Sequence, residues 1–349
     1  MRKQKGRNMP EAGLPIRLSD VAARAGVSLA TVSRSLTNTS GVSPALAERV
    51  RGIAADMGYV TNMNARSLAG GLASSIGLVL TNIADPYFAE IASSLIAVAA
   101  DDSRSVQIAH AVTPEDVLAQ IKIFRSYRVG AIVLAGSGYS DPATEIATGK
   151  ELAAYEQSGG RIAVVGRHAL DASAVLPDNI GAGRAIAEHL VALGHSKIAV
   201  LSGPEQLNAV GDRMRGLTEV LGSRMVHISQ HAFSREGGAE GVRELYGDTL
   251  VAGPRRRDIT AIVALSDVMA VGAFSELRAL GVTIPTDISL TGFDDISVAD
   301  VISDGLTTAR LSTQHIGEAI FELTCGENTQ RRDIEIGFTL IERGSTAQP

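Results

Sequence analysis

Apolar residues in the first sixty positions recur at the three- and four-residue spacing of short amphipathic helices. Val21, Ala22 and Ala25 fall on one face of a first helix, and Val32 and Leu36 fall on one face of a second. A third helix follows with the same kind of spacing. The starts and ends of these helices are marked by capping and helix-breaking residues, namely Ser19, Gly26, Ser28, Ser43, Pro44 and Gly58. The pattern predicts three short helices around one small core over residues 15–61.

From residue 76 onward the pattern changes to short apolar runs that alternate with helical stretches. This order predicts parallel sheets covered by helices on both faces, which is an α/β fold. The length of the chain from residue 76 onward fits two such lobes better than one. The apolar runs expected to be strands are Ile76–Leu80, Val106–Ala111, Ala131–Leu134, Ile162–Val165, Ile198–Leu201, Met225–Ile228, Ile259–Leu265 and Ile288–Thr291.

The composition is that of an ordinary globular protein, with 45% apolar and 20% charged residues. Cys325 is the sole cysteine, which excludes an intramolecular disulfide and a cysteine-rich zinc site. The basic residues Met1–Arg7 lead into no apolar export segment, and no apolar run is long enough to cross a bilayer. We therefore expect a cytoplasmic protein without a membrane partner.

Charge is divided unevenly along the chain. Residues 1–75 contain ten Lys and Arg against four Asp and Glu, whereas the remainder contains 22 against 34. A basic head on an acidic body indicates a phosphate-bearing partner for the head. Near the start of the second predicted helix, Leu29, Ala30, Ser33 and Arg34 face away from the core, at the end that enters a major groove of DNA in helix-turn-helix proteins. The alternative is an ordinary three-helix bundle.

Open parallel sheets bind ligands beyond the carboxyl ends of their strands, so the residues after each apolar run are candidates for a binding site. Two aromatic rings, two arginines and several carboxylates gather at these positions. Such a set suits a polyhydroxylated ligand, because rings stack on the apolar face of a sugar while charged groups bracket its hydroxyls. The positions are 85–88, 166–167, 266–267 and 292–295, together with Arg213 on a helix.

Several motifs, read together, resemble the lactose/galactose repressor (LacI/GalR) family of transcriptional regulators. The resemblance runs through the chain and leaves out the first dozen or so residues and the extreme C-terminus. The segments that carry it are Leu18–Ala22, Gly26–Ser28, Thr31–Arg34, Val42–Ser43, Gly58–Tyr59 and the run Asn62, Ala65, Arg66, Ser67 and Leu68.

The resemblance implies a role for each residue of the head. Arg34 is the expected base reader, because its guanidinium matches the acceptor pair of guanine. Leu68 is expected to wedge into the minor groove from a hinge helix that orders on DNA. The full set of implied DNA-binding residues is Arg17, Leu29, Ala30, Thr31, Ser33, Arg34, Ser43, Asn62, Ala65 and Leu68. Residues 1–14 would be a disordered basic tail, and residues 62–75 the hinge helix and linker.

For the body, the resemblance implies a periplasmic-binding-protein-like, two-lobed domain over residues 76–349 that binds an effector and dimerises. The first lobe is expected over about 76–174 and 308–332, and the second over about 175–307 and 333–345. The implied effector-binding residues are Asp85, Tyr87, Phe88, Arg167, Arg213, Ser266 and Asp294. Ser266 replaces a usual Asn and Gly166 a frequent acid, which favours an acidic or modified sugar over a plain pentose or hexose.

These features together predict a DNA-binding repressor of the nucleoid, controlled by a sugar or sugar acid. A purine-responsive, co-repressed regulator is one alternative, and a transport binding protein without DNA function is another. An enzyme is not expected, because the glycine-rich run Gly181–Ala187 lacks the third glycine of a dinucleotide site and other catalytic motifs are missing. We expect no catalytic residue, metal or cofactor. Because no leucine heptad follows Ser345, a homodimer is expected.

Overall fold

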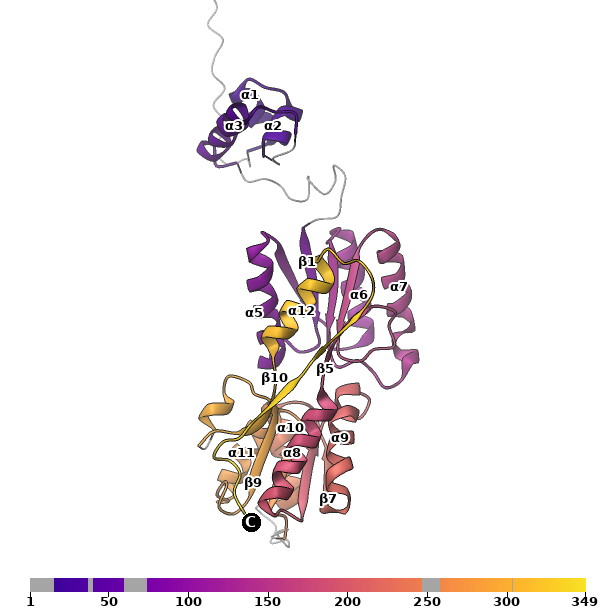
Figure 1. The fold of residues 1–349 in the computed structure, drawn as a ribbon, viewed down its shortest axis with the longest axis vertical. Coiled ribbons are helices and arrows are strands. Elements are labelled where there is room, and N and C mark those ends of the chain that lie inside the picture. Colours follow the sequence, from indigo (N-terminus) through magenta and orange to yellow (C-terminus); the bar gives the residue numbers. More distant parts are fainter. Residues whose placement is uncertain (1–15, 37–39, 60–73, 247–257, 303) are drawn as a thin grey trace, which may run out of the picture. The chain divides into compact units, whose positions relative to one another are not determined.

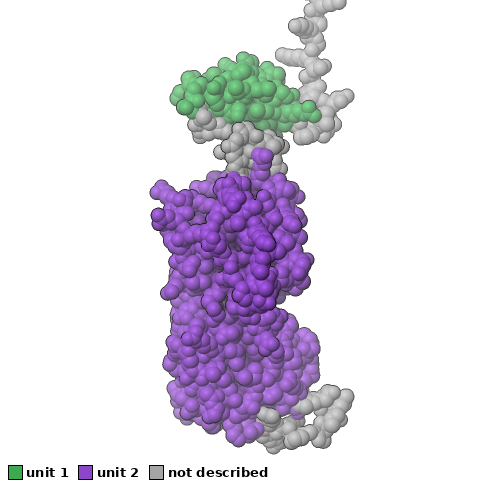
Figure 2. All heavy atoms as spheres, turned by 90° about the vertical axis from the view of Figure 1, so that its right-hand side faces the viewer, with its two compact units in different colours: residues 1–71 green, residues 72–349 purple. Residues whose placement is uncertain are grey.

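The chain divides into two compact units, residues 1–71 and 72–349 (Figure 2). The computed structural model describes residues 16–36, 40–59, 74–246, 258–302 and 304–349. The expected tail and three of the expected DNA contacts, Asn62, Ala65 and Leu68, lie outside the described residues. Within the described ranges, no helix is both long and apolar enough to span a bilayer.

The first unit contains three helices, α1 (Leu18–Ala25), α2 (Leu29–Leu36) and α3 (Pro44–Asp56). Gly26 adopts φ 67° in the turn between α1 and α2, a left-handed conformation that glycine adopts without steric cost. Ser28 and Ser43 cap the next two helices, because their hydroxyls accept the N–H groups of Thr31 and Leu46. The core consists of Val21, Ala22, Ala25, Val32, Val50 and Ala54. The predicted three-helix head is therefore present.

The start of α1 differs from the expectation that Ser19 caps it. The cap position is Arg17, two residues earlier, so the helix begins at Leu18 and Ser19 lies inside its first turn. The Asp20 carboxylate accepts the N–H of Arg17 at 2.8 Å, which satisfies a donor that the helix itself leaves unpaired. An acidic side chain in the first turn also interacts favourably with the positive end of the helix dipole, so Asp20 supplies what was assigned to Ser19.

The first lobe of the second unit is built on a six-stranded parallel sheet (Figure 1). Its strands are β1 (Ser75–Leu80), β2 (Ser105–His110), β3 (Ala131–Ala135), β4 (Arg161–Val165), β5 (Ser173–Pro177) and β11 (Asp333–Ile336), and its helices are α5 (Pro86–Asp101), α6 (Pro114–Ser126), η1 (Pro142–Glu145), α7 (Ile146–Gln157) and α12 (Thr313–Cys325). The strand order is β11-β5-β4-β3-β1-β2. Helices α5 and α12 pack on one face, and α6 and α7 pack on the other.

The second lobe repeats this arrangement with one antiparallel edge. Its strands are β6 (Ile198–Ser202), β7 (Met225–Gln230), β8 (Ala261–Ala264), β9 (Ser289–Asp294), β10 (Thr307–Leu311) and β12 (Phe338–Ile341), and its helices are α8 (Asn179–Leu193), α9 (Asn208–Leu221), η2 (Gly222–Arg224), α10 (Arg235–Tyr246), α11 (Asp267–Ala279) and η3 (Ala299–Val301). The order is β12-β10-β9-β8-β6-β7, and β12 runs antiparallel to β10. Helices α8 and α9 cover one face, and α10 and α11 the other.

The described chain passes from one lobe to the other after β5, after β10 and after β11. These crossings correct the expected lobe boundaries. Strand β10 was assigned to the first lobe, but it pairs with β9 of the second; β11 was assigned to the second lobe, but it pairs with β5 of the first. The chain changes lobe only once a strand is complete, because each strand needs a neighbour of its own sheet for its backbone hydrogen bonds.

Candidate functional site

The outer surface at the start of α2 presents the side chains predicted to read DNA. Leu29 is 53% exposed, and Ala30, Ser33 and Arg34 are exposed as well. A Cβ atom placed on Gly41 would lie 3.9 Å from Arg34 Cδ, so the Arg34 side chain runs beside the loop that leads to α3. The prediction that these four residues face away from the core is confirmed by their exposure, whereas their contacts with bases stay a prediction.

The other described residues assigned to DNA binding have local structural partners. Thr31 is half-buried, and its hydroxyl lies 2.9 Å from that of Ser28. Ser43 is exposed and caps α3, and Arg17 is exposed at the start of α1. Capping does not exclude a phosphate contact, because a helix N-terminus offers further N–H donors. The DNA-binding roles of these three residues stay predictions.

Arg213 is the centre of a buried polar cluster in the second lobe. It projects from α9, is 5% exposed, and donates to Asn179 Oδ1 at 2.8 Å, to the Leu265 carbonyl at 2.5 Å and to Asp294 Oδ1 at 2.6 Å. Its guanidinium carbon also lies 4.8 Å from the centre of the Phe293 ring. The guanidinium is therefore held on all sides by the protein.

The close approach of α8 and α9 allows this cluster to form. A Cβ atom on Gly183 of α8 would stand 2.5 Å from the Arg213 carbonyl oxygen, nearer than any real side chain lies. Glycine at this position therefore lets the two helices touch at the turn that carries Arg213, and it brings the guanidinium within reach of Asn179 at the start of α8.

Two carboxyl groups next to Arg213 are held in an environment that disfavours their charge. Burial raises the pKa of Asp294, and Arg213 offsets part of that rise. Burial, then the neighbouring Asp294 charge, raises the pKa of Asp85 to about 6. Burial also raises the pKa of the Tyr87 phenol. The structure thus brings together Asp85, Tyr87, Arg213 and Asp294, four of the residues predicted to meet the effector.

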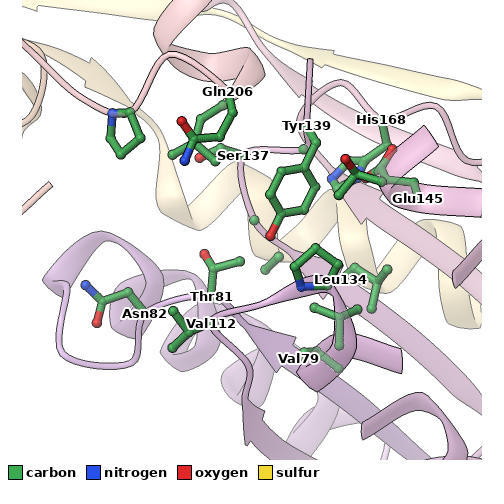
Figure 3. A pocket seen from close by; sticks show the side chains of 18 of the residues that line it. Val79, Thr81, Asn82, Val112, Leu134, Ser137, Tyr139, Glu145, His168 and Gln206 are labelled. Carbon is green, nitrogen blue, oxygen red and sulfur yellow. The ribbon is translucent and has the colours of Figure 1, made fainter. Parts of the chain in front are cut away.

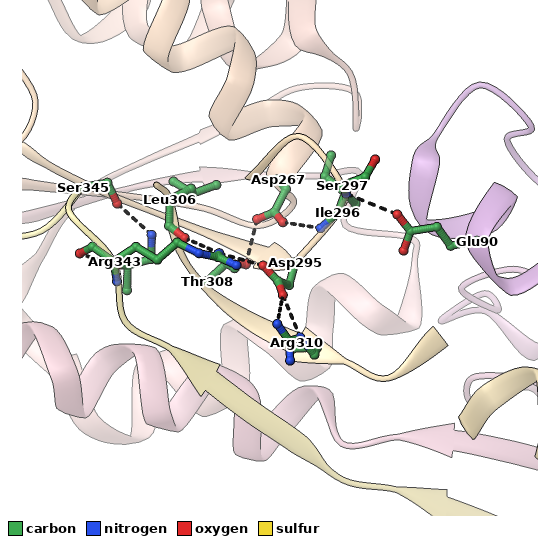
Figure 4. Close-up of polar contacts among 11 residues, drawn as sticks. Glu90, Asp267, Asp295, Ile296, Ser297, Leu306, Thr308, Arg310, Arg343 and Ser345 are labelled. Carbon is green, nitrogen blue, oxygen red and sulfur yellow. Dashed lines mark hydrogen bonds and ion pairs between the residues drawn. The ribbon is translucent and has the colours of Figure 1, made fainter. Parts of the chain in front are cut away.

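The loop after β9 is anchored by carboxylates (Figure 4). Asp295 accepts from Arg310 and Arg343, each at 2.7 Å. Asp267 accepts the Thr308 hydroxyl at 2.7 Å and the Ile296 N–H at 2.9 Å, and burial raises its pKa well above the ordinary value. These carboxylates therefore hold the loop in place from within the second lobe.

Glu90 of α5 accepts the Ser297 N–H at 3.2 Å, and this contact ties the first lobe to the second (Figure 4). Ser266, a predicted effector contact, caps α11 by accepting the Met269 N–H at 3.3 Å. That hydroxyl already serves the helix, so its contact with an effector stays a prediction.

Arg167 joins the lobes instead of lying in an open site. It follows β4 of the first lobe and forms a two-pronged ion pair with Asp212 on α9 of the second lobe, at 2.9 and 2.5 Å. The two residues line a hollow of about 340 Å³ together with Asp178 and Asn179. A second link lies nearby, where Asn208 Nδ2 donates to the carbonyl oxygens of Tyr139 and Arg167. The lobes are thus held together on this side.

An apolar cavity lies between the strand ends of the first lobe and two loops of the second (Figure 3). Its volume is about 310 Å³. Asp85 and Phe88 line it, whereas Tyr87, Arg167, Arg213, Ser266 and Asp294 are not among its lining residues. Tyr87 instead packs edge-to-face on Phe88, with ring centres 5.2 Å apart. The predicted effector residues therefore divide between this cavity, the buried Arg213 cluster and the interlobe hollow.

Sequence reasoning missed most of the residues that line the cavity. Thr81 and Asn82 directly follow β1, and Ser137 and Tyr139 closely follow β3, so the strand-end rule that selected Asp85 could have selected them too. His168 pairs with Glu145, and Gln206 comes from the other lobe; nothing in their local sequence indicates this meeting.

Known families match both parts of the chain. Residues 17–62 match the family described as bacterial regulatory proteins, lacI family, and residues 187–346 match the periplasmic binding protein-like domain. A curated relative, the HTH-type transcriptional regulator reg1 of Streptomyces lividans, is 30% identical over 95% of this chain and 96% of its own length.

Solved structures show the same fold. The lac repressor dimer bound to operator and the anti-inducer ONPF superposes with a TM-score of 0.78 at 23% identity, covering 96% of this chain and 100% of that one. The transcriptional regulator CelR in complex with cellobiose superposes with a TM-score of 0.66 at 26% identity, covering 95% and 99%. From the identity with reg1 along nearly its whole length, and from the helix-turn-helix match at its head, this chain belongs to the LacI family of bacterial transcriptional regulators, which are not enzymes.

Proposed function

We propose that this regulator represses transcription in the cytoplasm as a homodimer, with the start of α2 in the major groove of an operator. The observation that carries the proposal is the exposed set Leu29, Ala30, Ser33 and Arg34 at one helix end of a basic unit. One of the similar structures, the lac repressor dimer, was solved bound to an operator. The tail, the hinge at 62–75 and Leu68 keep the roles expected from the resemblance.

The proposed control is a small molecule of the sugar type, bound between the two lobes. The cavity of about 310 Å³ lies beyond the carboxyl ends of the strands, which is where open α/β sheets take their ligands. A ligand that favours one interlobe angle changes operator affinity, and the operator must change ligand affinity by the same factor. A titration of ligand with and without operator tests this coupling, because equal affinities in the two titrations exclude it.

Replacing Arg34 by alanine is expected to weaken binding to the preferred operator by about 5- to 150-fold. This range corresponds to the loss of one good two-pronged contact with guanine, about 1–3 kcal/mol. Affinity for unrelated duplexes should fall only a few-fold, since that binding depends on total charge. The measurement is fluorescence anisotropy of the full chain on a duplex selected from a random library, at fixed salt concentration.

Arg24→Ala is the matched control for Arg34→Ala, because it removes the same charge from an exposed position on α1 of the same unit. Its effect should be small and equal on preferred and unrelated duplexes. If Arg34→Ala behaves like Arg24→Ala, Arg34 reads no base. If the unmodified chain shows no salt-dependent binding to any duplex, the DNA-binding proposal itself is wrong.

A further inference from the structure

The wall of the interlobe cavity combines apolar and neutral polar side chains. The apolar ones are Val79, Phe88, Val112, Val117, Leu134, Leu207 and Phe233, and the neutral polar ones are Thr81, Asn82, Ser137, Tyr139, Thr144 and Gln206. Figure 3 shows Thr81 and Asn82 beside Val112, with Tyr139 entering from the other side. Val112 is 63% exposed, so an apolar surface stands uncovered at this wall.

Cations are missing from this wall. No Lys or Arg is among the described residues that line the cavity, whose ionisable members are Asp85, Tyr139, Glu145 and His168. Outside the cavity, the guanidinium groups of Arg167 and Arg213 are already paired with Asp212 and Asp294. A ligand carboxylate or phosphate would therefore lose its hydration without gaining a cation.

The one basic group on the wall is also committed. His168 Nδ1 lies 2.5 Å from Glu145 Oε1, and His168 Nε2 lies 3.1 Å from the Val165 carbonyl oxygen. The second Glu145 oxygen accepts the Ala169 N–H at 2.7 Å. Both ring nitrogens and both carboxylate oxygens are therefore used by the protein, and this pair shapes the wall without offering a charge to a ligand.

Four of the neutral polar side chains, by contrast, are uncommitted. Among the described residues, no hydrogen bond joins the side chains of Thr81, Ser137, Tyr139 or Gln206 to another protein group, whereas the Asn82 oxygen accepts the Ala84 N–H at 3.0 Å. Hydroxyl and amide groups both donate and accept, which is what the hydroxyls of a neutral sugar require. These four side chains can therefore bind the hydroxyls of a ligand.

From this lining we infer that the effector is an uncharged, hydroxyl-bearing molecule with an apolar substituent, such as an aryl glycoside, and not a sugar acid or sugar phosphate. The inference rests on the proposed function, because it takes the cavity as the regulatory site. The hydroxyls of the effector face Thr81, Ser137, Tyr139 and Gln206, and its substituent covers the exposed Val112. This replaces the acidic sugar that the Ser266 and Gly166 positions favoured.

The test is a binding series measured by calorimetry on the full chain. Each series contains three derivatives of one anomer of glucose, galactose or mannose: the phenyl glycoside, the methyl glycoside, and the phenyl glycoside of the corresponding uronic acid (the uronide). In any series that shows binding, the phenyl glycoside is expected to bind at least tenfold more tightly than the other two derivatives. A uronide that binds as tightly as its neutral counterpart overturns the inference. So does a panel in which no neutral member binds.

Variants check that the binding occurs in this cavity. Val112→Asp is expected to weaken phenyl glycoside binding at least tenfold and to change methyl glycoside binding less than threefold. Ile123→Asp, at a 41% exposed position of α6 away from the cavity, should change neither. Tyr139→Phe removes one uncommitted hydroxyl and should weaken both ligands about fivefold. If Val112→Asp and Tyr139→Phe both bind like the unmodified chain, the cavity does not hold the ligand.

Operator binding measured in the same samples separates the two proposals. If a neutral glycoside binds as described but leaves operator affinity unchanged, the regulatory role of the cavity is wrong and the inferred ligand class is supported. If a sugar acid releases the operator, the regulatory role is supported and the inferred ligand class is wrong.

Discussion

Replacing Arg213 by alanine is expected to lower the free energy of unfolding by about 3–5 kcal/mol, because it leaves the buried Asp294 carboxylate without its partner. Asn179 and the Leu265 carbonyl lose their donor at the same time. Urea unfolding followed by circular dichroism measures the loss. If Arg213 served only to hold a ligand, the Arg213→Ala protein would bind the ligand more weakly but its free energy of unfolding would not change.

Two companion variants make the Arg213 result specific. Arg215→Ala, two residues further along α9, removes a side chain that is 69% exposed and pairs with Glu219; the free energy of unfolding should change by less than about 0.5 kcal/mol. Joining Arg213→Met with Asp294→Leu removes both charges, and the double variant should be more stable than Arg213→Met alone. A loss below about 1 kcal/mol for Arg213→Ala would contradict the structural role assigned to this cluster.

Asp85→Asn is expected to stabilise the protein by about 2–3 kcal/mol at pH 8 and by almost nothing at pH 3. Burial and the Asp294 charge raise the pKa of Asp85 from 3.8 to about 6 in the folded state. Each pKa unit of this rise corresponds to about 1.4 kcal/mol in the free energy of unfolding. The folded state therefore binds this proton more tightly than the unfolded chain, so its stabilising contribution is complete below pH 4 and is lost as the pH rises to about 6. Asparagine cannot ionise and avoids that loss.

The comparison depends on the helix cap that Asp85 provides. Its Oδ1 accepts the Tyr87 N–H at 3.1 Å, and an asparagine oxygen can do the same. Asp85→Ala removes the cap and should show the same pH dependence with an added, pH-independent loss of about 1 kcal/mol. Chemical unfolding at a series of pH values measures both. A stability difference for Asp85→Asn that does not vary between pH 3 and pH 8 would show that Asp85 ionises normally.

The head could be predicted from the sequence because its signals are local. Ser28, Ser43 and Gly26 act on backbone groups within a few residues of themselves, and the structure confirms each one. The predicted start of α1 was wrong because Asp20, and not Ser19, accepts an unpaired N–H at the start of the helix, that of Arg17.

Four strands of the body escaped prediction, and their residues explain why. Strand β11 carries Asp333 and Glu335, and β10 carries Thr307 and Thr308, which are buried although polar. Thr308 is buried because Asp267 accepts its hydroxyl, which is a long-range contact. Strand β5 and strand β12 are short and do not alternate cleanly between buried and exposed positions. Hydrophobic periodicity cannot reveal strands whose burial depends on distant partners.

The sequence predicted where the effector site lies in the fold, but it did not predict which side chains contact one another there. The strand-end rule located Asp85 and Phe88 on the cavity wall. It could not show that Arg213 is saturated by Asn179, Leu265 and Asp294, since that requires knowing how α8, α9 and β9 meet. The choice between charged and neutral ligands depends on this saturation.

The late return of the chain to the first lobe sets an order for folding during synthesis. Helix α12 supplies Ile316 and Ile320 to the core that also contains Ile91 and Leu95 of α5. These residues of α5 leave the ribosome long before α12 does, so the lobe that is translated first cannot be completed until nearly the whole chain has been made. We therefore expect nascent chains that stop before residue 313 to expose this face of α5, where a chaperone that binds apolar segments can bind.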